Sequence, residues 1–200
     1  MPANFVLPLY PLENAVLLPG ETMVAPPPAE WPGQVAEGVR GFGGAVVASL
    51  VDGDSVHEVG VTAFVVRGPG APTLRGVARC RLLELVESET PLVRAERFPE
   101  PRAGASKASS LRRLLDSRYR QLCLRLDRRL EDETGASDLS SLTWRITANL
   151  GLSAEQQQGF LNVPDAVTRG RLLLVALREL EKRERFLRPW AHMRAGAEWN

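Results

Sequence analysis

Proline and glycine residues divide the first half of the chain into short apolar runs, and this spacing constrains the fold more than any other feature. Pro8, Pro11, Pro19 and Gly20 interrupt the first 25 residues, where a helix could not continue through them. The runs between such breaks are rich in β-branched and other apolar residues, which favour strands. The expected strands are residues 5–10, 15–18, 22–25, 44–51, 58–67, 73–86 and 91–98.

These short strands, with one short helix expected over residues 30–42, predict a closed or nearly closed β-barrel. Turn sequences lie where the strands should end, at Asp52-Gly53-Asp54 and at Gly68-Pro69-Gly70-Ala71-Pro72. Gly41-Phe42-Gly43-Gly44 is also predicted to be a turn, because it precedes a strand instead of following one and opening a helix.

Beyond residue 98 the apolar spacing becomes helical. Residues 99–108 are small, polar and interrupted by proline and glycine, which predicts a linker. A long helix is expected from Ser109 or Ser110 to about Glu133, because leucines repeat there at three- and four-residue steps. Further helices are expected over residues 139–150, after Ser153 with Gln156 at capping-box spacing, and after Asp165.

The predicted fold class is therefore α+β, with an N-terminal β-barrel over residues 1–98, a linker over 99–108 and a C-terminal α-helical bundle over 109–200. In the last helix Glu179, Glu181 and Glu184 each precede an arginine by four residues. This orientation stabilises a helix, and we expect these charges to form a solvated face.

Composition argues against a metal site and against a membrane span. With two cysteines and two histidines, the chain does not supply a cluster of soft ligands for zinc, so we expect no metal and no other cofactor. The first residues lack the basic region of a secretory signal, and the longest aliphatic run, residues 172–177, is far shorter than the ~20 residues that span a bilayer. We therefore expect a cytoplasmic location.

Charge differs between the two halves. Residues 1–98 carry 7 basic and 11 acidic side chains, whereas residues 99–200 carry 18 basic and 13 acidic ones. An acidic barrel repels phosphates, so nucleic-acid binding by the first half is disfavoured.

Three stretches of the predicted barrel read LPLYPLENAVLLPG from Leu7, EVGVTA from Glu58 and GVARCRL from Gly76. In this order they resemble the N-terminal domain of Lon proteases. The last matches a strand pattern of glycine, two residues, arginine, one residue, arginine and an apolar residue. Further along, WRITANLGLS from Trp144 and QQGFL from Gln157 resemble that family's helix, turn and helix.

This resemblance covers nearly the whole chain and implies a PUA-like pseudobarrel followed by a helical bundle. It also implies a non-catalytic module that recognises unfolded or specific polypeptide segments, here expected to stand alone without the ATPase and protease parts. The expected partners are polypeptide clients, or a separate protease or chaperone. The oligomeric state is not predicted.

The chain departs from the family pattern after the Pro-Gly turn, and this segment holds the candidate polypeptide contacts. Pro26, Pro27 and Pro28 favour an extended backbone, and Trp31 supplies a large apolar side chain. A rigid apolar loop can hold a polypeptide at low entropic cost. The alternative interpretation, that Trp31 covers one end of the barrel, stays open.

Catalytic motifs of a complete Lon protease are absent from the sequence. No Gly-x-x-x-x-Gly-Lys-Ser/Thr loop is present to cradle nucleotide phosphates. The only lysines, Lys107 and Lys182, do not lie in a setting like the family's serine and lysine dyad. We therefore predict that the chain is not an enzyme. The alternative function is RNA binding, because PUA-like barrels are also used on RNA and the second half is basic.

The absence of both motifs gives the first testable prediction. Calorimetric titration with ATP should show no saturable binding, and the purified chain should leave unfolded casein intact. Saturable nucleotide binding or casein cleavage would contradict the non-catalytic assignment.

Overall fold

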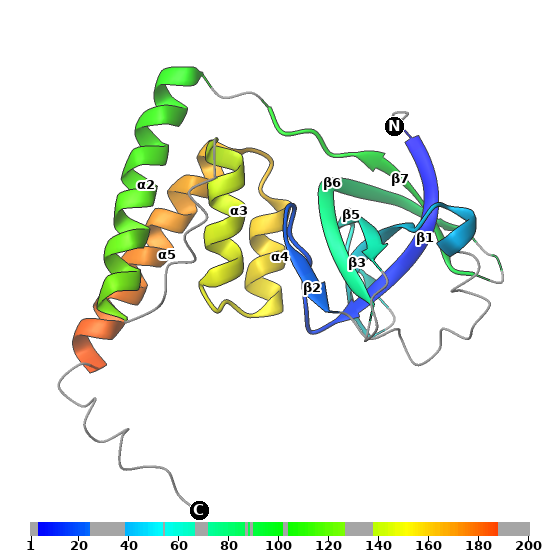
Figure 1. Cartoon of the computed structure of the whole chain (residues 1–200), viewed down its shortest axis with the longest axis horizontal. Coiled ribbons are helices and arrows are strands. Elements are labelled where there is room, and N and C mark those ends of the chain that lie inside the picture. The colour runs from blue at the N-terminus through cyan, green and yellow to red at the C-terminus, as the bar shows by residue number, and fades with distance from the viewer. Residues whose placement is uncertain are drawn as a thin grey trace, which may run out of the picture. The chain divides into compact units, whose positions relative to one another are not determined.

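The computed structural model describes residues 4–24, 39–53, 55–66, 72–86, 88, 90–101, 104–126 and 138–187 (Figure 1). Contacts group the chain into two compact units. The first combines Met1–Arg102 with Trp144–Asp165, and the second combines Ala103–Thr143 with Ala166–Asn200. The units are thus not continuous along the chain, unlike the predicted division into 1–98, 99–108 and 109–200.

Strands of the first unit form one seven-stranded sheet within the described residues. They are β1 (Asn4–Glu13), β2 (Thr22–Val24), β3 (Ala45–Asp52), β4 (Ser55–Val56), β5 (Val59–Val66), β6 (Thr73–Val86) and β7 (Leu92–Arg97). β3, β5, β6 and β7 agree with the predicted runs within one residue at each end, and β2 is one residue shorter than predicted. β1 continues three residues beyond the predicted run, through Pro11 to Glu13. The two-residue β4 was not predicted. It pairs with the end of β3 around the turn that begins at Asp52.

Strand β1 closes a ring of five strands, of which it is one. It pairs antiparallel with β7 and parallel with β3, with Leu9 opposite Val47. Antiparallel pairs then connect β7 to β6, β6 to β5 and β5 to β3. The predicted α+β class with a closed barrel is confirmed. β2 and β4 lie outside the ring, on β6 and β3.

Alternate side chains along the strands enter two separate apolar cores. One core takes side chains from β1, β3, β6 and β7: Leu7, Leu9, Ala45, Val47, Cys80, Val93 and Ala95. The other takes the alternate residues of β1, β3 and β5, such as Tyr10, Val46 and Val61, together with Trp144 and Leu161. β3 is therefore buried on both faces.

The strand predicted over residues 15–18 is wrong. These residues form no strand, yet the valine and both leucines are buried in the second core. The backbone N–H of Leu18 donates to the Glu21 carboxylate at 3.0 Å instead of to a sheet partner. A Cβ on Gly76 of β6 would overlap the Leu18 carbonyl, so this loop packs directly on the strand backbone. Apolar spacing alone could not separate a buried loop from a buried strand.

Helices follow at α2 (Ala105–Arg125), α3 (Leu139–Asn149), α4 (Ala154–Asn162) and α5 (Ala166–Leu187). α2 begins four residues before Ser109 and has Gly104 at its N-cap, without a side-chain cap. The alanines and the lysine of residues 105–108 are good helix formers, so part of the predicted linker is helical. The capping box at Ser153 and Gln156 is confirmed.

Of the helix predicted over 30–42, residues 39–42 are described: 39–41 are helical, and residue 42 already belongs to the following turn. None of the helices in the described ranges combines the length and the apolar character needed to cross a membrane.

In the second unit Glu181 is buried, which corrects the prediction of a solvated glutamate face. Its carboxylate lies 3.8 Å from the Arg118 guanidinium of α2. Periodicity within α5 could not show that α2 covers this position. Glu179 is exposed as predicted, but it pairs with Lys182 at 2.6 Å. Arg169 is also fully buried, and its Nε donates to the Thr143 hydroxyl at 2.9 Å.

Candidate functional site

Pro26, Pro27, Pro28 and Trp31 lie outside the described residues, so their role as polypeptide contacts stays a prediction. The described chain ends two residues before Pro26, at Val24 of β2. The surface around β2 is therefore the described part of the molecule nearest in sequence to the predicted contacts.

Two rows of side chains cross β2, β6 and β5 on one face of the sheet. Val24, Thr73 and Val66 lie opposite one another in the first row. In the second row the residues opposite one another are Thr22, Arg75 and Phe64. We call these six residues the exposed β2–β6–β5 face, because directly paired residues and residues two apart point the same way.

Large apolar side chains on this face are open to solvent. Val24 is 66% exposed, Val66 50% and Phe64 45%. Single exposed apolar residues are ordinary, but three of them on one face of the same sheet make this face a candidate interaction surface.

The opposite face of the same strands is covered, and this fixes which side chains are exposed. Leu74 of β6 is fully buried, and Met23 and Val65 pack against the second core. Because side chains alternate along a strand, burial of these three residues directs their neighbours to the other side.

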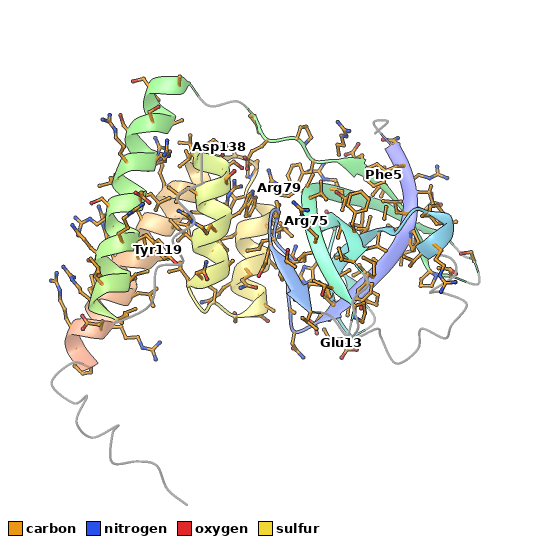
Figure 2. All side chains as sticks on the ribbon, in the orientation of Figure 1. Phe5, Glu13, Arg75, Arg79, Tyr119 and Asp138 are labelled. Carbon is orange, nitrogen blue, oxygen red and sulfur yellow. The ribbon has the colours of Figure 1, made fainter. Side chains whose placement is uncertain are left out.

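Arg75 is the cation of the exposed β2–β6–β5 face. Its side chain, labelled in Figure 2, is exposed. The residue lies on β6 between Thr22 of β2 and Phe64 of β5. An arginine stem can pack along apolar groups while its guanidinium stays in water and donates to carbonyl or carboxylate oxygens. The face thus combines apolar contact with hydrogen-bond donation.

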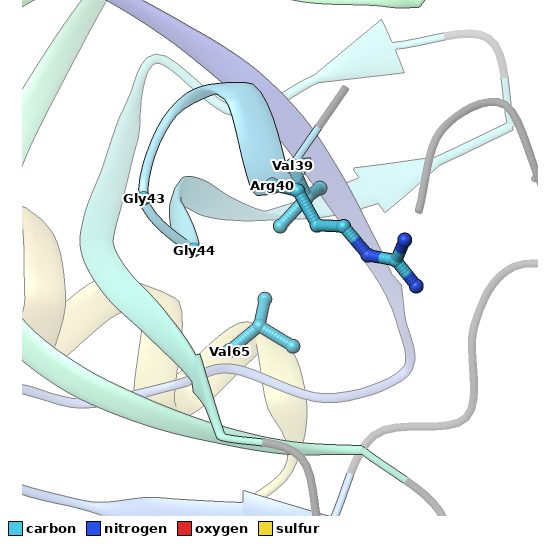
Figure 3. A pocket seen from close by; sticks show the side chains of 5 residues that line it. All are labelled: Val39, Arg40, Gly43, Gly44 and Val65. Atoms are coloured by element: carbon cyan, nitrogen blue, oxygen red, sulfur yellow. The ribbon is translucent and has the colours of Figure 1, made fainter. Parts of the chain in front are cut away.

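A hollow of about 320 Å³ lies at the other side of β5 (Figure 3). It is lined by Val39, Arg40, Gly43, Gly44 and Val65. The turn predicted at 41–44 is confirmed for 42–44, immediately before β3. Among these described lining residues, none is a nucleophile or a general base.

Arg79 is a buried arginine of β6 that fastens the end of α4 to the barrel within the first unit. Its Nη1 donates to the carbonyls of Leu161 at 3.0 Å and Val163 at 2.5 Å, and its Nη2 donates to that of Pro164 at 2.8 Å. The guanidinium carbon also lies 5.5 Å from the centroid of the Trp144 ring. The Leu161 carbonyl belongs to the last turn of α4 and the other two follow it, where a helix leaves its carbonyls without partners.

Burial lowers the pKa of Arg79, and Glu100 and Asp165 oppose this effect. Oε1 of Glu100 lies 3.5 Å from Nη2 of Arg79. The adjacent Cys80 is fully buried, and burial raises the pKa of its thiol to about 12. Cys80 thus packs as a small apolar residue of the core and is not placed as a reactive thiolate. In the described ranges no cluster of three metal-ligating side chains occurs.

Solved structures similar to this chain are Lon N-terminal domains. The N-terminal domain of Mycobacterium avium complex Lon protease aligns with a TM-score of 0.69 and 18% identity, over 87% of this chain and 98% of that one. A Lon N-terminal domain protein from Xanthomonas campestris aligns with a TM-score of 0.62 and 20% identity, over 86% and 98%. This chain has the fold of a Lon N-terminal domain. No family model and no curated protein matches the sequence.

Residues that carry the resemblance to the Lon N-terminal domain have packing roles in this Lon-type fold. A Cβ on Gly60 would approach the Ala48 carbonyl to 2.7 Å, so only glycine lets β5 lie this close to β3. Gly76 and Arg79 hold the loop before β2 and the end of α4, as described above. The motif residues Gly60, Gly76 and Arg79 are therefore needed for the packing of this fold. Sequence reasoning missed the exposed β2–β6–β5 face, because strand register decides which exposed residues are neighbours.

Replacing Arg79 should destabilise this Lon-type fold strongly. We expect Arg79→Leu to lower the free energy of unfolding by about 2–4 kcal/mol, because three carbonyls at the end of α4 lose a charged donor. Arg81→Leu is the matched control, since Arg81 is 47% exposed and lies 3.8 Å from Glu96. It should cost less than about 1 kcal/mol. Urea unfolding measures both, and equal losses would contradict the role of Arg79.

Proposed function

We propose that this chain is a non-catalytic binding module that takes unfolded or extended polypeptide segments on the exposed β2–β6–β5 face. The observation that carries the proposal is the set of solvent-exposed apolar side chains on this face, with Val24 on β2 and both Val66 and Phe64 on β5, on either side of β6. Fold similarity to a domain of Lon protease supports it, because that protein is a protease and its substrates are polypeptides.

Apolar burial supplies the affinity in this proposal. Covering apolar surface contributes ~25 cal/mol per Å², so a client side chain seated on Phe64 and Val66 would gain a few kcal/mol before ordering costs. Weak binding of this kind suits a module that must release different segments. Trp31, in the segment that follows β2, is proposed to add a second apolar contact.

The partners proposed are polypeptide clients, which the chain would hold or pass to a separate protease or chaperone. The sequence offers neither a phosphate loop nor the protease dyad, so the proposal assigns no chemical step to the chain itself. RNA is the rival ligand, because Arg75 lies on the same face. The salt dependence of binding distinguishes the two.

Exposed phenylalanines on the two units provide a matched test. Phe64→Ser should weaken binding of fluorescently labelled, reduced and carboxymethylated lactalbumin about tenfold, because a large apolar contact is lost. Phe186→Ser, at a side chain that is 73% exposed on α5, should leave binding unchanged. Fluorescence anisotropy measures both affinities. Trp31→Ala should weaken binding as well.

Salt provides the second arm of the same experiment. Polypeptide binding should change little between low and physiological salt, whereas RNA binding should fall steeply as counterion release becomes less favourable. Equal effects of the two phenylalanine variants on affinity would show that the client does not bind on the exposed β2–β6–β5 face. A steep salt slope with an RNA probe, together with no binding of lactalbumin, would replace polypeptide by RNA.

A further inference from the structure

The outer edge of β2 has backbone groups that no other strand in the described ranges uses. β2 is a three-residue strand, and among the described strands it pairs with β6. It lies outside the closed ring, so closure does not cover its second edge. A strand edge presents N–H and C=O groups at the spacing of an extended polypeptide, and this makes it a template for another strand.

Register shows which groups of β2 face outward. The N–H of Gly76 donates to the Glu21 carbonyl at 2.9 Å, so these two residues occupy a hydrogen-bonded position of the antiparallel pair. Hydrogen-bonded positions recur every second residue, which places Met23 opposite Leu74 at the next one. Thr22 and Val24 therefore direct their N–H groups away from β6. No backbone hydrogen bond joins either group to another described residue on that edge.

Side chains at this edge suit an added strand on both faces. Thr22 and Val24 are exposed on one face, in line with Val66 and Phe64. Met23 is partly buried on the other face, against the second core. An added strand would thus place alternate side chains beside Thr22 and Val24 and the others beside Met23.

From this geometry we infer that the chain binds its polypeptide by strand addition: an extended client segment pairs with the edge of β2 that faces away from β6 and lays alternate apolar side chains beside Thr22 and Val24. The inference rests on the proposed function and names the conformation of the bound segment. Main-chain hydrogen bonds give sequence-tolerant affinity, and alternate apolar side chains give preference. A client segment rich in proline could not donate to this edge and should bind poorly.

Amide hydrogen exchange of the full chain, followed by NMR, tests the inference directly. Adding saturating carboxymethylated lactalbumin should slow exchange at the Thr22 and Val24 amides at least about tenfold, because both become hydrogen-bonded. The Met23 amide is the internal control, since its donor already faces β6. Binding without protection of Thr22 and Val24 would overturn strand addition and leave the proposed function in place, whereas no binding at all would overturn both.

A pair of variants at one position separates the backbone from the side chain. Thr22→Pro removes the outward N–H and should weaken lactalbumin binding at least about tenfold, while an edge strand tolerates the proline ring. Thr22→Val is the matched side-chain variant: it keeps the N–H and should bind at least about tenfold more tightly than Thr22→Pro. If both variants bind equally, strand addition is wrong. A dimer in sedimentation, with both amides protected before any probe is added, would assign the edge to a second copy and overturn the inference.

Discussion

The pairing of β6 is the constraint on which the rest of the first unit depends. Its first residues pair with β2 on one side and β5 on the other, and its last residues pair with β7. Register shifts interrupt both the β5 and the β7 pairings, between Thr62 and Ala63 and between Leu82 and Glu84. Such irregularities bend a strand and increase its twist. One strand can therefore belong to the barrel at one end and present an uncovered face at the other.

Burial on one side of β6 determines exposure on the other. Leu74 and Arg79 both lie toward the second core. Leu74 is buried in it, and Arg79 donates to carbonyls at the end of α4. With these positions fixed, a slip of one residue would bury Arg75 and expose Leu74, which is energetically prohibitive. The composition of the exposed β2–β6–β5 face is thus a consequence of core packing and is as well determined as the core itself.

Local patterns were sufficient to predict the fold class, most of the strands and the capping box at Ser153, because those features depend on neighbours in sequence. The resemblance to Lon N-terminal domains rested on residues such as Gly60, Gly76 and Arg79, whose packing now explains the pattern. Long-range contacts were not predictable in the same way. The apolar spacing of residues 15–18 predicts a strand, and only the close contact with Gly76 shows that this segment is a buried loop. The spacing of Glu181 predicts a solvated side chain, and only its contact with Arg118 of α2 shows that it is buried. The candidate surface also depends on register between distant strands.

Site-specific photo-crosslinking tests most directly whether polypeptide binds to this face of the Lon-type fold. Benzoylphenylalanine placed at Phe64 should crosslink carboxymethylated lactalbumin on irradiation, and the same group at the exposed Phe186 should not. Crosslinking from position 64, with the client site identified by mass spectrometry, is the result that the account predicts. Crosslinking from position 186 alone, while lactalbumin still binds, would contradict it.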